Sequence, residues 1–512
     1  MEHADLAQAA AVCGALGSAL VLLARGRLAL LAGLVALGLA EAGLVGALND
    51  GGFDKLTSPA GGAAALVGLG LFGGAAALLV RRPAWVPLAV LVAAPFRPPL
   101  DFNSSNRFFV SVAEDGRLGR LLPLYFVLVA AGLALGWRAL RGESVRALPR
   151  QLALPAAAFF AFAFLSLLWA DDVEAGANML TFFTLPFAVL LAVVARAEYP
   201  DWAPRALAAA AIALASLFAA VGVWQAITHD LFFYAPNLAV SNANTDFFRV
   251  TSLFGDPSLY GRHVVLGIGV VLTLLATTRS RSGILLAALA LMWAGLFFSY
   301  SQSSMAALLL VTLAIAFATG DRGVRRTVGL LALGAAVVAL GFGAVKVIGG
   351  ESINRVTSDR TDRVEDALRV VRHDPVIGVG IGGQPRASRL LTGSERPNAN
   401  FVSHTTPLTV TAELGVIGLV LYVWLLVGGV RSIAEVYTSQ RALGLALGAS
   451  LLALFVHALF YSGFLEDPLT WMVLAVAAGW LMRPGPPEPS PAERARARAG
   501  SKPDGGVAAA TP

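Results

Sequence analysis

A histidine followed at a fixed spacing by two glycines is the strongest chemical signal in this sequence. Nine residues separate His404-Thr405 from Gly415-Val-Ile-Gly418. Histidine has an unperturbed pKa of about 6.5, so it can accept a proton from a hydroxyl group near neutral pH. Glycines allow neighbouring backbone to approach a helix closely. The pattern predicts a catalytic base beside a tightly packed helix; the alternative is a histidine that only caps a helix or lies in a loop.

The histidine ends a strongly basic segment. Within it, Thr361 to Arg372 is predicted to form a short amphipathic helix with Val364, Leu368 and Val371 on one face. Because guanidinium groups bind phosphate and carboxylate oxygens well, this segment predicts an anionic partner. Its arginines are Arg355, Arg360, Arg363, Arg369, Arg372, Arg386, Arg389 and Arg396.

The elements that position these groups are predicted to be membrane helices. Of the 512 residues, 57% are hydrophobic and only 14% are charged, with a mean hydropathy of +0.72. Apolar runs of about 20 residues, long enough to cross a bilayer, recur along the chain. The sequence therefore predicts an all-α polytopic transmembrane bundle of about 13 to 15 spans, with one large outside loop that contains short helices. The apolar run 84–96 is short enough to be a half-span or a re-entrant segment.

Three regions are expected. Residues 1–150 form the N-terminal transmembrane helices, and 151–483 form a transmembrane core that includes the outside loop 349–406. Residues 484–512, rich in Pro, Ala and Gly, are predicted to be a disordered cytoplasmic tail. Arginines gather at alternate span ends, which places the N-terminus outside the cytoplasm and the C-terminus inside. A second long outside loop, 227–257, lies on the side of the N-terminus.

Other features narrow the function. The single cysteine, Cys13, excludes an intramolecular disulfide and a cysteine-based metal cluster. The formal charge of +6 is attributed to loop topology and anionic lipid, so no nucleic-acid partner is expected. The sequence contains no Asp-x-Asp metal pair, P-loop or Rossmann fingerprint. Ionisable residues within predicted spans, Glu41 and His457, are interpreted as polar contacts between helices. The acidic pairs at span ends, Asp171-Asp172 and Glu466-Asp467, are interpreted as topology markers.

The chain resembles the O-antigen ligase and polymerase superfamily, membrane glycosyltransferases that share a Wzy-type C-terminal domain. Its members have the same histidine-to-glycine spacing at the end of the main outside loop; here Thr405 follows the histidine where members have Asn, Ser or Gln. The similarity extends to Arg363-Val-Glu-Asp-Ala-Leu, to His373-Asp-Pro-Val-Ile-Gly-Val-Gly380 and to Arg249-Val-Thr-Ser-Leu-Phe-Gly-Asp256-Pro257. It covers about 160 to 480.

The resemblance implies a GT-C-like helical fold and a metal-independent, cofactor-free, inverting transfer of a glycan from undecaprenyl pyrophosphate to an acceptor hydroxyl. It implies the plasma or inner membrane, with the active site on the extracytoplasmic face, and membrane lipids as further partners. His404 would be the catalytic base. Arg249 and Arg363 would bind pyrophosphate, since a guanidinium fork matches phosphate oxygens; solvated or headgroup-binding arginines are the alternative. The structural motif would comprise Gly415, Gly418, Asp256 and Pro257.

Two positions leave alternatives open. Family members usually have Ser-Arg at a helix tip where this chain has Ser301-Gln302, and a neutral amide cannot neutralise phosphate charge. Gln302 would then contact the pyrophosphate by hydrogen bonding, with Arg262 or a loop arginine supplying the cation. Asp256 either caps the following helix or orients Arg249.

The sequence does not separate a ligase from a polymerase of exopolysaccharide or O-antigen. A lipid-linked oligosaccharide flippase or exporter is a third possibility, and a purely structural membrane protein a fourth. Placement discriminates between them: an enzyme gathers its polar groups at one outward-facing cavity, whereas a flippase needs a polar path across the membrane.

Overall fold

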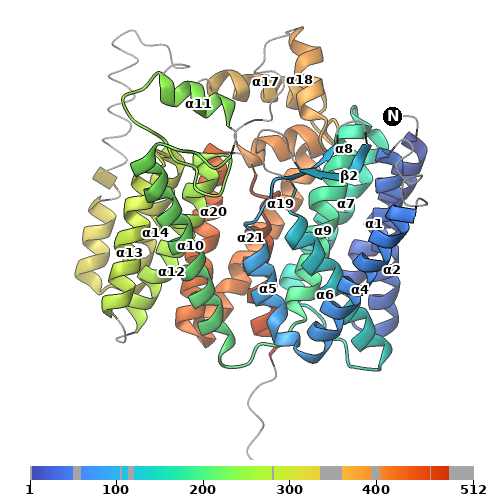
Figure 1. Cartoon of the computed structure of the whole chain (residues 1–512), viewed down its shortest axis with the longest axis horizontal. Helices are drawn as coiled ribbons and strands as arrows, with labels where there is room; N and C mark the ends of the chain where they lie inside the picture. The colour runs from blue at the N-terminus through green and yellow to red at the C-terminus, as the bar shows by residue number, and fades with distance from the viewer. Residues whose placement is uncertain are drawn as a thin grey trace, which may run out of the picture.

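The computed structural model is a bundle of roughly parallel and antiparallel helices (Figure 1). It describes residues 3–49, 59–103, 106–112, 120–233, 235–278, 282–331, 333–334, 360–393, 403, 405–461 and 463–483. The all-α polytopic fold expected from the apolar runs is confirmed. The predicted tail 484–512 and most of the predicted span 328–348 lie outside the described residues.

Ten helical segments among the described residues are long and apolar enough to cross a membrane. These are α1 (Ala4–Leu23), α2 (Arg27–Leu48), α6 (Leu122–Leu140), α7 with η3 (Arg150–Trp169), α8 with η4 and α9 (Val173–Ala195), α10 (Ala203–Thr228), α12 (Pro257–Thr277), α14 (Gln302–Thr319), α19 (Thr406–Ser439) and α20 (Arg441–Phe460). Two shorter apolar helices stand beside them, α13 (Ser282–Phe297) and α21 (Pro468–Leu481).

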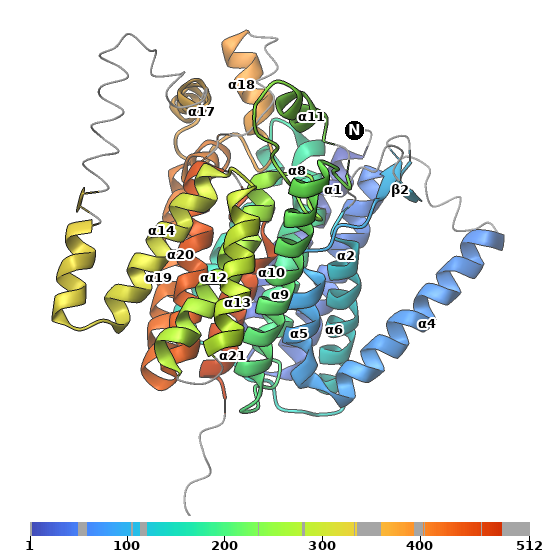
Figure 2. The same cartoon turned by 60° about the vertical axis from the view of Figure 1, so that its left-hand side comes forward.

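A further pair of apolar helices is sharply bent, as in a broken span or a re-entrant loop. Helix α4 (Pro59–Arg81) meets the short η1 (Pro83–Trp85) and α5 (Val86–Ala93) at a bend of 108°. Figure 2 shows α4 leaning away from the bundle while α5 stays within it. Arg81-Arg82-Pro83 marks the break, because proline disfavours a helical conformation in the residue before it. The short helix within 84–96 agrees with both predicted alternatives, a half-span and a re-entrant segment.

The bundle has two distinct ends. The end that carries the N-terminus also carries α11 (Pro236–Ala243), α17 (Arg360–His373) and α18 (Gln384–Thr392), and we call it the loop face (Figure 1). We call the opposite end the arginine end. There α6 ends with Arg138 in its last turn, α20 begins at Arg441 and α21 ends at Leu481. The described parts of the loops 227–257 and 349–406 therefore share one face, as predicted.

One element at the loop face was not predicted. Strand β1 (Leu100–Asn103) pairs antiparallel with β2 (Asn106–Val112) between α5 and α6. In the sequence, the polar run Asn103-Ser-Ser-Asn106 lies between segments that contain apolar and aromatic residues. Turn residues between such runs are typical of a hairpin.

Small residues allow the helices to approach closely. A Cβ on Gly17 would lie 2.8 Å from the backbone N of Leu37, and one on Gly33 would lie 2.7 Å from the backbone N of Val21. Helices α1 and α2 thus pack nearly backbone to backbone, as is common in membrane bundles. One apolar core joins α1, α7, α9, α19 and α21, and a second joins α10, α12, α13, α14 and α20.

Candidate active site

Helix α19 is interrupted at Gly415, one of the two glycines of the motif. Its φ of 64° and ψ of −168° lie in a region open essentially to glycine alone. A Cβ at this position would lie 2.1 Å from the carbonyl oxygen of Val376. The predicted close approach of backbone to this helix is therefore present at Gly415, and the partner is the turn that follows α17.

That turn, residues 375–383, is hydrogen bonded to the interrupted helix. Val379 N donates to Ala412 O (3.1 Å), Gly380 N to Glu413 O (2.8 Å) and Val416 N to Pro375 O (2.9 Å). A Cβ on Gly378, whose φ is +69°, would lie 2.4 Å from the Glu413 carbonyl. Helix and turn therefore form one unit, the broken-helix region, which we define as residues 375–383 and 412–417.

The broken-helix region supports α17, which bears Arg363. The predicted helix is present, and Val371 of its predicted apolar face packs on the bundle, but Leu368 is 38% exposed, whereas Ala367 and Val370 are fully buried. The reason is that α17 packs on α18 and α19 through a small apolar cluster that includes Val370, Val379, Ala387 and Ala412. Arg363 lies four residues before Ala367, so the half-buried arginine shares the side of α17 that packs on the bundle.

His404 lies outside the described residues, but both of its neighbours are described. Ser403 is fully buried, and its hydroxyl is 2.8 Å from that of Thr409. The Thr405 hydroxyl donates to Leu459 O at 3.4 Å, which joins the start of α19 to the end of α20. The backbone on either side of the predicted base is thus anchored at the loop face.

Arg249 lies at the loop face, ahead of α12. Asn242 fixes its backbone by accepting from Arg249 N (3.0 Å) and donating to Arg249 O (3.1 Å). Arg249 Nε donates to Ser299 O at 3.4 Å. Burial lowers the pKa of this guanidinium and Asp256 counteracts part of that effect, yet arginine stays charged at neutral pH. A half-buried cation on a fixed backbone can bind an anion.

Asp256 caps α12, as one of the two alternatives predicted. Its Oδ1 accepts from Ser258 N (2.7 Å) and Leu259 N (2.9 Å), with Pro257 in the first turn. Asp256 also forms a side-chain hydrogen bond with Tyr461; burial, and then this carboxylate, raise the pKa of the tyrosine. The structure therefore shows the capping alternative, and Asp256 reaches Arg249 only through its charge.

Arg262 is buried in an ion pair rather than exposed at the surface. Only 3% of the arginine side chain and 5% of the Asp467 side chain are exposed, and Nη1 bonds to Asp467 and to Gly463 O. The interpretation of Asp467 as a topology marker is wrong, because it neutralises this arginine and caps α21 through Leu469 N at 2.8 Å. The sequence around Asp467 does not reveal the ion pair, because its partner Arg262 lies about 200 residues earlier.

His457 extends this ion pair into a network. Arg262 Nε can only donate, so His457 Nδ1 accepts its hydrogen bond (3.2 Å) and the neutral ring carries its proton on Nε2. Nε2 lies 3.0 Å from Ser258 O and 3.2 Å from Ser303 Oγ. The interpretation of His457 as a polar contact between helices is confirmed.

Three serine residues connect this network to Arg249. Ser303 Oγ is 3.2 Å from Ser301 Oγ, and Ser301 N donates to Ser299 Oγ at 3.2 Å. Ser299 O is the acceptor for Arg249. We call this series the polar network; it comprises Asp467, Arg262, His457, Ser303, Ser301 and Ser299. Gln302 starts α14 with its side chain exposed, outside the network.

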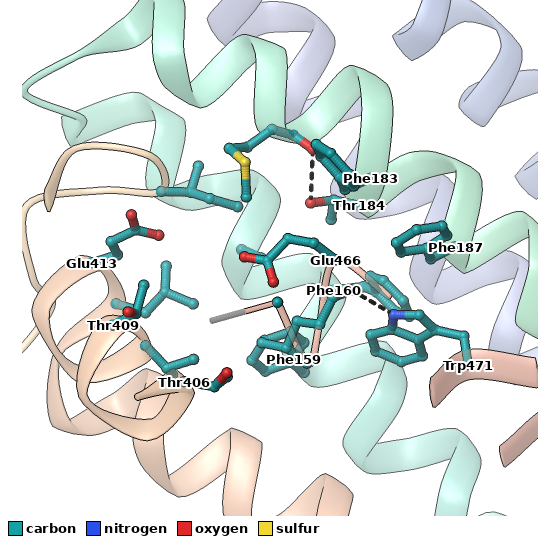
Figure 3. A pocket seen from close by; sticks show the side chains of 17 residues that line it. Phe159, Phe160, Phe183, Thr184, Phe187, Thr406, Thr409, Glu413, Glu466 and Trp471 are labelled. Carbon is teal, nitrogen blue, oxygen red and sulfur yellow. Dashed lines mark hydrogen bonds between the residues drawn. The ribbon is translucent and has the colours of Figure 1, made fainter. Parts of the chain in front are cut away.

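A small cavity lies between the broken-helix region and the polar network. It has a free volume of about 50 Å³, room for a few water molecules. Figure 3 shows Glu413 and Glu466 pointing into it, with Thr406 and Thr409 on one side and aromatic rings on the other. Burial raises the pKa of Glu466. Gly463, whose carbonyl accepts from Arg262, also lines this cavity, so the two regions meet there.

The described site thus brings Arg249, Asp256, Pro257 and Arg262 together at the start of α12, and Arg363, Gly415 and Gly418 together around α17 and α19. Sequence reasoning missed the serines of the polar network and the role of Glu413, whose carboxylate accepts from the backbone N–H groups of Gly382 and Gln384. These guanidinium groups belong to segments of the loop face, where α19 also begins. Such groups can hold a phosphate-bearing substrate.

A comparison with known protein families gives a match to part of the chain. The family model of the O-antigen ligases matches residues 264–423, from the third turn of α12 to the middle of α19. The match includes His404, Gly415, Gly418 and Arg363, whereas Arg249 and Arg262 lie just before it. No curated protein matches the chain significantly.

Proposed function

We propose that this multi-pass membrane protein, whose residues 264–423 match the O-antigen ligase family model, transfers a glycan from undecaprenyl pyrophosphate to an acceptor hydroxyl during cell-surface polysaccharide assembly. The acceptor oxygen forms the new bond to the anomeric carbon, and the bond from that carbon to the pyrophosphate breaks. The base takes the hydroxyl proton, and the lipid pyrophosphate leaves with the electron pair. Attack opposite the leaving group inverts the anomeric centre.

In this proposal His404 is the base, and Arg249 and Arg363 stabilise the charge that develops on the pyrophosphate. Fixed cations at that position lower the barrier because they require no reorganisation during the reaction. Arg262 contributes from within the polar network, while Gln302 can donate a hydrogen bond from the helix tip. Guanidinium groups neutralise the leaving group, so the scheme requires neither a metal nor another cofactor.

The family match over α12 to α19 is the observation that carries the proposal, since that segment contains the histidine, its spacing and the glycine-dependent break. The loop-face position of the polar network supports an enzyme over a flippase, because its residues lie at the ends of α12, α14, α20 and α21. Arginine-rich loops at the opposite end favour placing the loop face outside the cytoplasm. We therefore propose the plasma or inner membrane, with the site on its extracytoplasmic face.

The test is glycan transfer by purified protein supplied with undecaprenyl-pyrophosphate glycan and candidate acceptors. His404→Ala should reduce the transfer rate by at least about 100-fold, the contribution typical of a general base. His373→Ala is the matched control, because this histidine is exposed and its ion pair among the described residues is with its neighbour Asp374; the variant should transfer like the wild type. Equal rates for wild type and His404→Ala would refute the assignment.

The same assay separates the alternatives. Transfer to a second lipid-linked glycan, giving longer chains, identifies a polymerase, whereas transfer to a different acceptor identifies a ligase. Movement of the lipid-linked glycan across vesicles without any new glycosidic bond would instead identify a flippase.

A further inference from the structure

A polar cavity lies at the arginine end of the bundle, at the opposite end from the candidate active site. Its volume is about 400 Å³, within the range of roughly 300–1,000 Å³ that is typical of ligand pockets. The end of α6, the segment before α7, the residues after α9 and the start of α2 enclose it. The polar side chains that line it belong to Arg138, Glu143, Ser144, Arg146, Arg196 and Glu198. The proposed transfer reaction uses none of them.

Arg196 is the most buried charged residue of this cavity, with only 6% of its surface exposed. Its guanidinium donates to Val21 O of α1 (2.9 Å), to Arg146 O (3.2 Å) and to Ala192 O of α9 (3.4 Å). These three carbonyls are neutral, and they fix the guanidinium between three parts of the chain. A guanidinium has five N–H groups, so two of them remain for a ligand.

The two carboxylates of the cavity are bound by a different arginine. Arg138 Nε bonds to Glu143 at 2.6 Å, and its Nη2 lies 3.5 Å from Glu198. In the part of the chain that is described, neither Arg146 nor Arg196 forms an ion pair. Three arginines against two glutamates leave one net positive charge. The negative end of the α9 dipole offsets only about half of one charge, so the cavity favours an anion.

The cavity lies at the depth of the membrane boundary. Trp137 and Leu140, in the last turn of α6, are 49% and 65% exposed. The guanidinium carbon of Arg141 lies 5.0 Å from the centre of the Trp137 ring. An exposed tryptophan beside an arginine at the end of a span is typical of the interface between hydrocarbon and headgroups. Arg138 belongs to the same turn, so the cavity lies at the level of lipid phosphate groups.

We propose that this cavity binds the phosphate group of an anionic glycerophospholipid from the leaflet around the arginine end. Arg196 contacts the phosphate from within the bundle, and Arg146 contacts it from the side of the solvent. One phosphodiester charge balances the one net positive charge, whereas the headgroup of a zwitterionic lipid brings a cation that the arginines repel. The bound lipid joins α1, α6 and α9. This inference goes beyond the proposed function, because it concerns neither the glycan donor nor its acceptor.

The experiment measures the affinity of the full-length purified protein for phosphatidylglycerol in micelles of an uncharged detergent. Phosphatidylcholine is the matched zwitterionic lipid, and the Tm in the same micelles is the second readout. Arg146→Gln removes a cationic side chain from the cavity but retains the backbone carbonyl that accepts from Arg196, so the variant should fold. Arg322→Gln is the control, because Arg322 is exposed just after α14, outside the cavity.

We expect phosphatidylglycerol to bind the wild type and to raise its Tm, and phosphatidylcholine to do neither. Arg146→Gln should bind phosphatidylglycerol about fivefold more weakly, the effect of losing one arginine near an anionic lipid. Glu198→Gln removes an opposing charge from the cavity and should bind the lipid about fivefold more tightly. Arg322→Gln should bind like the wild type.

Equal binding of the two lipids by the wild type would overturn the inference. A loss of affinity in Arg146→Gln no larger than that in Arg322→Gln would also overturn it. If inorganic phosphate raises the Tm as much as phosphatidylglycerol does, the cavity binds a soluble anion and the lipid assignment is wrong. Because the assay measures neither donor binding nor glycan transfer, each of these outcomes leaves the proposed function to its own test.

Discussion

The broken-helix region and the polar network stabilise neighbouring parts of the loop face by different means. The broken-helix region is held by backbone hydrogen bonds, and its geometry depends on glycines that leave no room for a Cβ. The polar network is held by side chains from four helices, arranged around one buried ion pair. We therefore expect substitutions in the broken-helix region to destabilise the protein through steric strain, and substitutions in the polar network to destabilise it through uncompensated charge.

Gly415→Ala should have the largest effect. The added Cβ would lie 2.1 Å from Val376 O, and the backbone angles at Gly415 are open essentially to glycine alone. Such strain costs roughly 1–3 kcal/mol before the clash is counted, so we expect a loss of more than about 3 kcal/mol, seen as lost yield or a much lower Tm in detergent.

Gly393→Ala is the control for that prediction. Its φ is also positive, at +59°, but nothing lies within 4 Å of its Cβ position. The expected loss is therefore only about 1 kcal/mol. Equal Tm values for the two variants would contradict the steric account of the broken-helix region.

Asp467→Asn tests the polar network and should rank second. Asparagine caps a helix as well as aspartate does, so the change removes mainly the charge that neutralises Arg262. Leaving that buried guanidinium unpaired should cost about 3–5 kcal/mol in the free energy of unfolding.

The surface pair between Asp201 and Arg483 provides the matched comparison. The Asp201 side chain is 90% exposed, so Asp201→Asn should change stability by less than about 1 kcal/mol. Similar losses for the two substitutions would show that burial of the Arg262 pair has no energetic consequence.

Glu466→Gln should have the smallest effect, and one that depends on pH. Burial raises the pKa of Glu466 in the folded protein. Protonation therefore stabilises the folded state, and stability falls as the pH rises from the ordinary glutamate pKa of about 4.3 towards the raised value. The variant should melt like the wild type near pH 4 and at a higher Tm at about pH 8.

Exposed Glu435, also charged but at the far end of α19, is the control. Glu435→Gln should leave the Tm unchanged at both pH values. A Glu466→Gln variant that is less stable than the wild type at pH 8 would mean that the ionised carboxylate stabilises the cavity.

Sequence reasoning recovered the broken-helix region better than the polar network. Gly415 and the glycines from Gly378 to Gly383 are visible in the sequence as a motif. In the structure their backbone angles and close contacts leave little room for any other residue type. On α17 the prediction failed at Leu368, because Leu368 and Ala367 differ by only one position and the partner surface on α18 and α19 selects between them. Hydrophobic pattern alone does not contain that partner.

The polar network could not be predicted because its members lie far apart in the sequence. Asp467 resembles an ordinary acidic residue at a span end, and Arg262 an ordinary basic one; only folding brings them together. His457 carried a usable signal, since an ionisable residue inside a span requires partners. Its partners Arg262 and Ser303 became identifiable only from the arrangement of α12, α14 and α20.

The central claim is that Arg249, which donates to Ser299 of the polar network, and His404, which precedes α19, act in one site for transfer from a pyrophosphate donor. Initial rates of glycan transfer by the wild type, Arg249→Lys, His404→Gln and the double variant test it most directly. Groups that act together in one transition state are not additive, so the double variant should be much faster than the product of the two single losses predicts. Losses that multiply independently, or single variants that transfer at the wild-type rate, would contradict the account.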